Sequence, residues 1–270
     1  MKISTKSPLR YPGGKSKALN QILPHIPLNI AEYREPFVGG GSVFTAIKQL
    51  FGKRIIYAIN DLNYDLICFW RYVQSDIDHL ADAVTAFRDY YAKDGRALHK
   101  FLTDEQNMRS DFDRAVRFFI MNRITFSGVM DAGGYSEQAF AKRFTASSIE
   151  RLRGIAPLLS SVKITHGDYA PLLFAEGDKV FIFLDPPYWS ATDSRLYGVR
   201  GHLHTSFDHE RFAENMRKCP HRWLITYDDS PRIRELFNFA NIVEWELQYG
   251  MNNFVNGSAA KGKELFIKNY

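Results

Sequence analysis

The chain has 270 residues, 45% of them hydrophobic, with 18 glycines and 11 prolines. This composition excludes a disordered or fibrous protein and is sufficient to bury the core of one or two globular domains. The two cysteines, Cys68 and Cys219, are too few and too far apart for a disulfide scaffold or a zinc site. The net charge of +5 suits a polyanionic partner but does not identify one.

The amino terminus has no apolar stretch long enough for a signal peptide. No window of the chain approaches the length of a membrane span. We therefore expect a cytoplasmic protein that does not associate with membranes.

Four apolar runs that end in an acidic residue indicate buried strands, at 54–61, 162–168, 179–187 and 222–229. Helical patterns lie between them, such as SVFTAIKQLF after Gly41 and a second one after Phe207, which Asp208 is expected to cap. This alternation predicts a parallel sheet covered by helices. Long amphipathic patterns instead fill residues 66–150 and predict a mainly helical insertion with one loop or hairpin. The carboxyl end is expected to form a loop and a final edge strand.

The stretch EPFVGGGSVF, residues 35–44, places three glycines just before a helical pattern. Such glycines permit a tight turn and close approach of a ligand to a helix N-terminus. A dinucleotide fingerprint would need a third spaced glycine where Phe44 stands, so NAD is not favoured. Asp61 lies twenty residues after Gly41, where a carboxylate can accept both hydroxyls of a ribose. A simple helix cap at Asp61 is the alternative.

A second glycine turn, RYPGGKS at residues 10–16, superficially resembles a phosphate-binding loop. A phosphate-binding loop needs a first glycine where this chain has Leu9, so the sequence disfavours nucleoside triphosphate binding. The turn would then present Lys15 either to a ligand carboxylate or simply to solvent.

The stretch DPPY, residues 185–188, follows the apolar run KVFIFL at the carboxyl edge of the predicted sheet. The two prolines stiffen the turn, so the Asp185 carboxylate and the Pro186 carbonyl become neighbouring acceptors beside the ring of Tyr188. Two acceptors and a stacking face suit an exocyclic amine of a planar base, whose lone pair they would aim at an electrophile. An ordinary Pro-Pro turn is the alternative.

In this order, the motifs YPGGK, EPFVGGGSVF, INDLN, HGDY and DPPY resemble the Dam-like, alpha-type group of DNA adenine N6-methyltransferases over nearly the whole chain. The resemblance implies an α/β class I methyltransferase fold, a Rossmann-like mixed sheet with helices on both faces, with an inserted target recognition domain. It also implies S-adenosylmethionine as cofactor and double-stranded DNA as partner. The catalytic domain would comprise residues 1–65 and 151–270, and the DNA-binding domain residues 66–150.

The resemblance also assigns roles to individual residues. The residues expected to bind the cofactor are Tyr11, Lys15, Phe37, Gly39, Gly41, Asp61, Asp168 and Asp185. Those expected to grip the target adenine, once it leaves the double helix, are Asp185, Pro186, Pro187 and Tyr188. The segment NRITFSG, residues 122–128, resembles a family signature, and the residues expected to contact DNA are Arg123, Phe126, Ser127, Val129 and Asp131.

Phe126 would be the side chain wedged into the DNA stack, with a core phenylalanine on a helix that begins near Phe112 as the alternative. Asp131 stands where GATC-specific members usually have arginine, so a GATC site is not expected. The basic residues expected to include phosphate contacts are Arg109, Arg114, Arg117, Arg123, Lys142, Arg143, Arg151 and Arg153. We expect no metal site, because the histidines near position 204 lack acids or cysteines at ligand spacing.

The predicted function is site-specific DNA adenine N6-methylation by direct transfer. Cytosine N4-methylation is an alternative because DPPY suits either amine, and a catalytically silent DNA-binding module is another. Glutamine methylation is disfavoured by Asp185. A cognate restriction endonuclease acting on the same site, a phage role and a solitary role all remain open.

Overall fold

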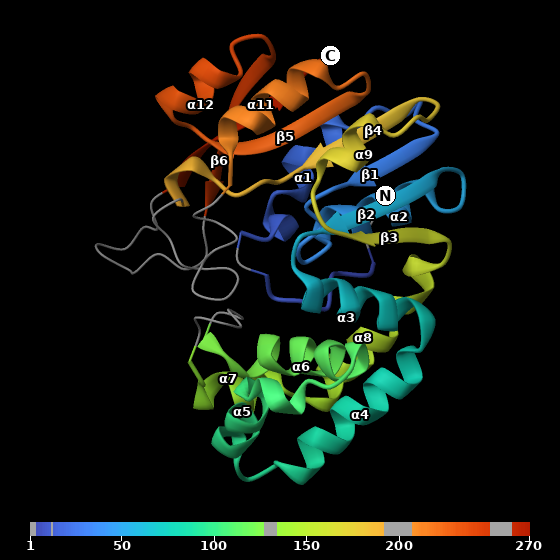
Figure 1. The fold of residues 1–270 in the computed structure, drawn as a ribbon, viewed down its shortest axis with the longest axis vertical. Coiled ribbons are helices and arrows are strands. Elements are labelled where there is room, and N and C mark those ends of the chain that lie inside the picture. The colour runs from blue at the N-terminus through green and yellow to red at the C-terminus, as the bar shows by residue number, and fades with distance from the viewer. Residues whose placement is uncertain (1–3, 12, 127–133, 192–206, 249–260) are drawn as a thin grey trace.

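The protein was examined as a computed structural model, which describes residues 4–11, 13–126, 134–191, 207–248 and 261–270. Its strands form a seven-stranded sheet in the order β3-β2-β1-β4-β5-β7-β6 (Figure 1). The strands are β1 (Glu32–Glu35), β2 (Ile56–Asp61), β3 (Val162–His166), β4 (Val180–Leu184), β5 (Arg222–Asp228), β6 (Asn241–Gln248) and β7 (Lys261–Lys268). Strands β1 to β5 are parallel, whereas β7 runs antiparallel between β5 and β6. The predicted class I methyltransferase fold is confirmed.

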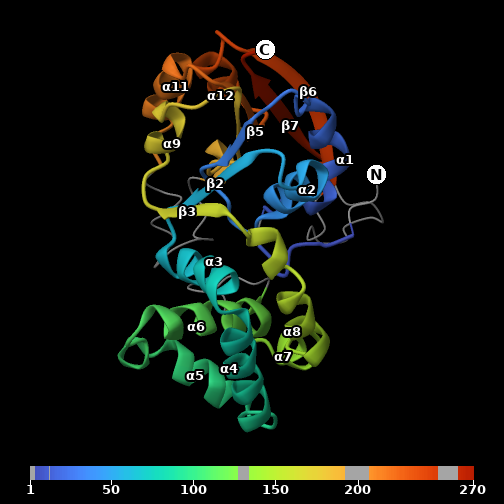
Figure 2. The ribbon, with the colours of Figure 1, turned by 90° about the vertical axis from the view of Figure 1, so that its right-hand side faces the viewer.

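Helices cover both faces of this sheet (Figure 2). One face carries α1 (Leu19–Ile22) and α2 (Ser42–Phe51), and the other carries α9 (Ala170–Phe174), α11 (His209–Lys218) and α12 (Pro231–Leu236). Strand β4 shows why its sequence is a continuous apolar run. Phe181 and Phe183 belong to one core cluster and Ile182 and Leu184 to the other, because successive side chains of a strand point to opposite faces.

A helical body lies between β2 and β3 in the chain and below the sheet in Figure 1. Its helices are α3 (Tyr64–Ser75), α4 (Ile77–Tyr90), α5 (Gly95–Thr103), α6 (Asp111–Ile124), α7 (Glu137–Arg143) and α8 (Ala146–Arg153). A polar side chain caps the start of every one of them: Asn63, Asp76, Asp94, Ser110, Ser136 and Thr145. These caps satisfy backbone N–H groups that have no partner within the helix, so the sequence defines where each helix begins.

Strand β1 was not anticipated, because its sequence EYRE is mostly charged. Arg34 is nevertheless only 1% exposed. Its guanidinium donates to Glu32 Oε1 at 2.6 Å and to the carbonyls of Leu172, Ala175 and Glu176 near the end of α9, at 2.7 to 2.9 Å. A buried charge that is fully paired in this way is tolerated, and apolar patterning cannot reveal it.

The carboxyl-terminal strand was expected at the edge of the sheet, and this prediction was wrong. Strand β7 lies between β5 and β6, and the edge position belongs to β6, which was also not anticipated. The interior position explains why Leu265, Phe266 and Ile267 are all buried. It also brings the acidic residue that precedes them next to the carboxyl end of β5.

Candidate active site

The glycine turn before α2 is shaped by two aromatic side chains. Gly39 and Gly41 have φ angles of 44° and 66°, which lie in the left-handed region that favours glycine. A Cβ atom on Gly39 would lie 2.9 Å from Tyr11 Cε1, and one on Gly41 would lie 2.8 Å from Trp70 Cζ2. The Trp70 indole also donates to the Gly39 carbonyl at 3.1 Å. Protein packing alone therefore requires glycine at these positions. Tyr11 lies against the turn, and its role as a wall of the cofactor pocket stays a prediction.

Asp61 ends β2 beside this turn. Its Oδ2 accepts from the Gly39 N–H at 2.9 Å and its Oδ1 accepts from the Asn63 N–H at 3.0 Å. The side chain that caps α3 is Asn63, which accepts from the Leu66 N–H, so Asp61 is not the helix cap. A third backbone hydrogen bond reaches Asp61 from Leu62, so the carboxylate faces backbone donors beside the glycine turn. Desolvation by burial raises the pKa of Asp61, against hydrogen bonds from the backbone of Asn63 and Gly39 that lower it.

Asp185 follows β4 and lies at the centre of a second group. Lys15 Nζ lies 2.7 Å from Oδ1 and donates to Oδ2 at 2.8 Å, and Thr226 Oγ1 of β5 donates to Oδ1 at 2.7 Å. The ammonium also lies 4.9 Å from the centre of the Tyr188 ring and donates to the Gly13 carbonyl at 2.9 Å. Lys15 is 4% exposed, so it is not a solvated lysine.

The two groups meet at one edge of the sheet. Strand β1 pairs with β2 on one side and with β4 on the other, so Asp61 and Asp185 flank the end of β1. That is the carboxyl edge, where open α/β sheets bind their ligands. Lys15 was expected beside a cofactor carboxylate, and this role stays a prediction. In the structure the Lys15 ammonium forms an ion pair with Asp185.

Side chains of the distant strands hold the DPPY turn, and sequence reasoning missed them. The turn continues into η6 (Trp189–Ala191), where Asp228 of β5 accepts from the N–H groups of Trp189 and Ser190 at 2.9 and 3.0 Å. The Tyr188 hydroxyl donates to Glu264 of β7 at 2.5 Å. The run of acids at the end of the predicted strand 222–229 was the available signal for Asp228, but nothing in the sequence pairs β7 with this turn.

Phe37 and Asp168 come together around Tyr169. The ring centres of Phe37 and Tyr169 are 5.3 Å apart, and Arg211 binds Asp168 through two hydrogen bonds of 2.8 and 3.2 Å. Desolvation raises the pKa of Asp168, but the hydrogen bond from Arg211 and that from the Ala170 N–H outweigh it, so the net shift is downward. The Asp168 side chain is 44% exposed and remains ionised and accessible.

Of the residues expected to contact DNA, Arg123 lies on α6 and Phe126 follows the end of this helix. The helix begins at Asp111, close to the predicted start, and Phe126 just beyond its end is 71% exposed, so Phe126 is not a core residue. Thr125 forms an isolated antiparallel β-bridge with Tyr135. Ser127, Val129 and Asp131 lie outside the described residues.

Arg123 is 5% exposed and stacks over Phe119, with 5.2 Å from its guanidinium to the ring centre. Desolvation, followed by the charges of Arg151, Arg10 and Arg143, lowers the pKa of Arg123 to about 10. In the described parts of the chain, none of these four arginines forms a salt bridge. Guanidiniums that lower one another's pKa in this way favour a nearby anion.

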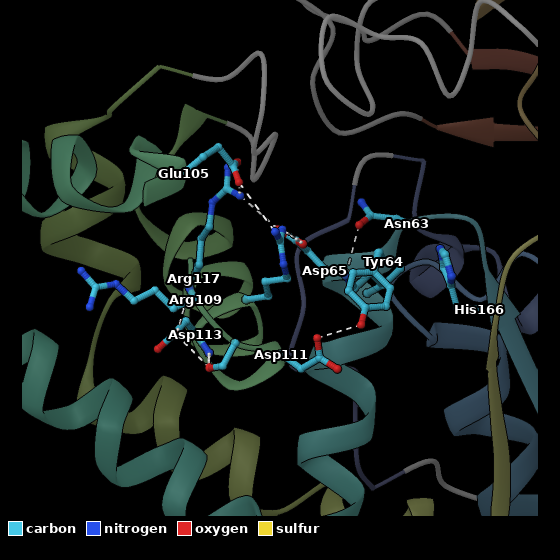
Figure 3. Close-up of polar contacts among 12 residues, drawn as sticks. Asn63, Tyr64, Asp65, Glu105, Arg109, Asp111, Asp113, Arg117 and His166 are labelled. Carbon is cyan, nitrogen blue, oxygen red and sulfur yellow. Dashed lines mark hydrogen bonds and ion pairs between the residues drawn. The ribbon is translucent and has the colours of Figure 1, made fainter. Parts of the chain in front are cut away.

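Other arginines of the insertion have structural roles. Arg114 and Arg117 of α6 bind Asp65 in the first turn of α3, at 3.0 and 3.1 Å, and Arg117 also binds Glu105 at 2.8 Å (Figure 3). Arg153 binds Asp78 and Asp82. Asp65 lies in the first turn of α3, which directly follows β2, so these ion pairs attach α6 to the helix that begins beside Asp61.

Two further features concern metals and membranes. Among the described residues, no three His, Cys, Asp or Glu side chains are grouped so that they could hold a metal ion. His209, part of the histidine-rich stretch, instead makes a 2.5 Å hydrogen bond with the Tyr227 hydroxyl in the core. No helix in the described part of the chain has the length and apolar character needed to cross a membrane.

Comparison with known proteins agrees with this geometry. The family described as D12 class N6 adenine-specific DNA methyltransferase matches residues 11–251. A type II methyltransferase of Methanocaldococcus jannaschii is 29% identical over 67% of this chain and 68% of its own length. The DNA N-6-adenine-methyltransferase of Escherichia phage P1 is 28% identical over 86% of this chain, which spans 31% of the phage protein. A type II methyltransferase of Lactococcus lactis is 26% identical over 100% of this chain and 97% of its own length.

These matches confirm the resemblance to the Dam-like enzymes and favour adenine over cytosine as the base that is modified. The family match covers strands β1 to β6 and the helical body, including the glycine turn, Asp61 and the DPPY turn. The chain belongs to the D12 class of N6 adenine-specific DNA methyltransferases.

Proposed function

We propose that this protein methylates N6 of an adenine that has been extruded from double-stranded DNA, with S-adenosylmethionine as the donor. The donor supplies a methyl group on a sulfonium, and transfer breaks the S–C bond, forms an N–C bond and moves one proton from the amine to Asp185. No covalent enzyme intermediate is required. Asp185 and the Pro186 carbonyl would accept from the amine, Pro187 would stiffen the turn, and Tyr188 would stack on the base.

The observation that carries this proposal is the hydrogen bonding of Asp185. A carboxylate offers about four acceptor positions. In the described residues Lys15 and Thr226 use two on Oδ1 and Lys15 uses one on Oδ2, so an acceptor position on Oδ2 remains. An N–H of the target amine can bind there, in one fixed direction, because the other bonds hold the carboxylate rigid.

The cofactor would lie between the two groups of the site. Asp61 would accept from its ribose, Asp168 from its adenine amine, and Tyr11, Phe37, Gly39 and Gly41 would line its pocket. The fit is supported by the position of Asp61 beside the glycine turn and by the accessibility of Asp168. Lys15 would face the cofactor carboxylate while it keeps its contact with Asp185.

DNA would bind through the helical body, with residues 66–150 as the recognition domain. The four arginines without an acid partner in the described chain, Arg10, Arg123, Arg143 and Arg151, support phosphate contacts. The exposed ring of Phe126 supports a wedge in the base stack. Ser127, Val129 and Asp131 would contact the bases, with Asp131 disfavouring GATC.

Two relatives are named type II methyltransferases, which supports a partnership in function with a restriction endonuclease that cuts the same site. A cytoplasmic location suits an enzyme that acts on DNA.

The test is expression in a host without DNA methylation, followed by nucleoside mass analysis and long-read sequencing. We expect N6-methyladenine within one sequence context. Asp185→Asn and Asp185→Ala should abolish the product while calorimetry still detects S-adenosylmethionine binding. N4-methylcytosine as the product, or turnover retained by either variant, would contradict the proposal.

A further inference from the structure

Glu264 is an unusual residue for the middle of a packed strand. It is 1% exposed, and glutamate is almost never fully buried unless it is paired. Its neighbours across the sheet are Asp228 on β5 and Trp245 on β6. A second acid beside a buried carboxylate increases the cost of burial, so Glu264 needs a specific partner.

That partner belongs to the reaction site. The Tyr188 hydroxyl donates to Glu264 Oε2 at 2.5 Å, a distance typical of a hydroxyl bound to an ionised carboxylate. The Tyr188 ring also has two neighbours that restrict its movement. The Lys15 ammonium lies 4.9 Å from the ring centre, and the centre of the Tyr227 ring lies 5.9 Å from it. A tyrosine held at its hydroxyl and at its ring has little freedom to rotate.

We propose that Glu264 is a positioning residue for methyl transfer, which fixes the Tyr188 ring through its hydroxyl so that the ring stands ready to stack on the target base. This inference rests on the proposed role of Tyr188 as the stacking wall. Glu264 would act through Tyr188 and not by direct contact with the base or the donor. Glu264 lies on the antiparallel strand β7, and Thr226 and Asp228 lie on β5. Hydrogen bonds from these two strands hold residues 185–190 in place.

The protonation of Glu264 gives this support a pH dependence. Desolvation, with Asp185 and Asp228, raises the pKa of Glu264 to about 7, against the Tyr188 hydrogen bond and the charge of Lys15, which lower it. These side chains come from the turn after β4, from β5 and from the amino-terminal turn, and the facing residue on β6 is the uncharged Trp245. Below that pKa the carboxyl becomes neutral, and its hydrogen bond with Tyr188 weakens.

The test combines kinetics, fluorescence and pH. Glu264→Gln, Tyr188→Phe, the double variant and Tyr188→Ala are compared in single-turnover methylation and in binding to duplexes with 2-aminopurine at the target position. Glu244→Gln is the matched control, because Glu244 is on the adjacent strand β6 and forms an exposed ion pair with Arg234. Thermal unfolding verifies that each variant is folded.

We expect Glu264→Gln and Tyr188→Phe each to slow methyl transfer about tenfold, the low end of the value of a hydrogen bond to a charged group. KM for the donor should be unchanged, and the double variant should be no slower than the worse single variant. The wild-type rate should fall below about pH 7, and this acid limb should disappear in both single variants. Glu244→Gln should keep the wild-type rate and pH profile.

The outcomes separate the inference from the function on which it rests. If Tyr188→Ala methylates at the wild-type rate, the proposed stacking role of Tyr188 fails. If Tyr188→Ala is impaired but the Glu264 and Tyr188→Phe effects multiply, or the acid limb persists in Tyr188→Phe, the positioning role of Glu264 is overturned. If Glu264→Gln does not fold, the pH profile of Tyr188→Phe alone decides, since that variant removes only the hydroxyl.

Discussion

Lys15→Met tests whether the ammonium and Asp185 act as one buried unit. The Lys15 side chain is 4% exposed and that of Asp185 is 21% exposed, with 2.7 Å between Nζ and Oδ1. Coulomb's law with an effective dielectric constant of about 20 gives an attraction of about 6 kcal/mol at this distance, most of it offset by desolvation of the two charges. Removing one partner of a buried pair costs roughly 3 to 5 kcal/mol. Because Asp185 retains some contact with water, we expect a loss of about 3 kcal/mol.

Urea denaturation at neutral pH measures this loss directly. Lys15→Arg keeps the charge and should retain most of the stability, and Lys17→Met, in the same turn but exposed, is the matched control. The double variant Lys15→Met with Asp185→Asn should recover at least half of the loss, because it removes the unpaired charge. If Lys15→Met lies within about 0.5 kcal/mol of the wild type, or if the double variant shows no recovery, the buried pair is not the unit described here.

Three further changes test the DNA-binding side and the glycine turn. Phe126→Ala should leave the free energy of unfolding within about 0.5 kcal/mol of the wild type. It should weaken DNA binding about 5- to 30-fold and reduce the 2-aminopurine signal of base extrusion. A large loss of stability would instead indicate a packing role. Arg143→Ala should lower the slope of log Kd against log salt by about 1, equally on specific and unrelated duplexes, and an unchanged slope would argue against a phosphate contact. Gly41→Ala should cost about 2 to 4 kcal/mol in urea unfolding, since its φ is 66° and the new Cβ would lie 2.8 Å from Trp70 Cζ2, whereas wild-type stability would mean that the turn can move.

The sequence predicted the local features of this fold well, because they depend on neighbouring residues. Helix α2 comprises the same residues as the predicted pattern, and Asp208 caps α11 by accepting from the Arg211 N–H at 2.8 Å. The DPPY turn follows a fully buried strand, as its apolar run indicated. Each of these features is visible in a short window of the chain.

The features that were missed depend on residues far apart in sequence. In the charged strand β1, the buried Arg34 donates to carbonyls at the end of α9, well over a hundred residues away in sequence. Thr226 and Glu264 reach the active site only through the strand order β4-β5-β7. A single sequence contains no signal for such pairings, so the support of the site could not be predicted even where its motifs could.

The distribution of charge argues for a division of labour between the two parts of the chain. Among the described residues, Asp185, Asp228 and Glu264 gather near the buried ammonium of Lys15, and Asp61 ends β2 at the same edge of the sheet. Such an edge attracts a sulfonium and repels phosphate. The arginines near the end of α6 have the opposite sign and no acid in the described chain to neutralise them. Under the proposed function, a DNA duplex would bind the helical body and stay away from the acidic edge, and an uncharged base turned out of the helix would approach Asp185 without an electrostatic penalty.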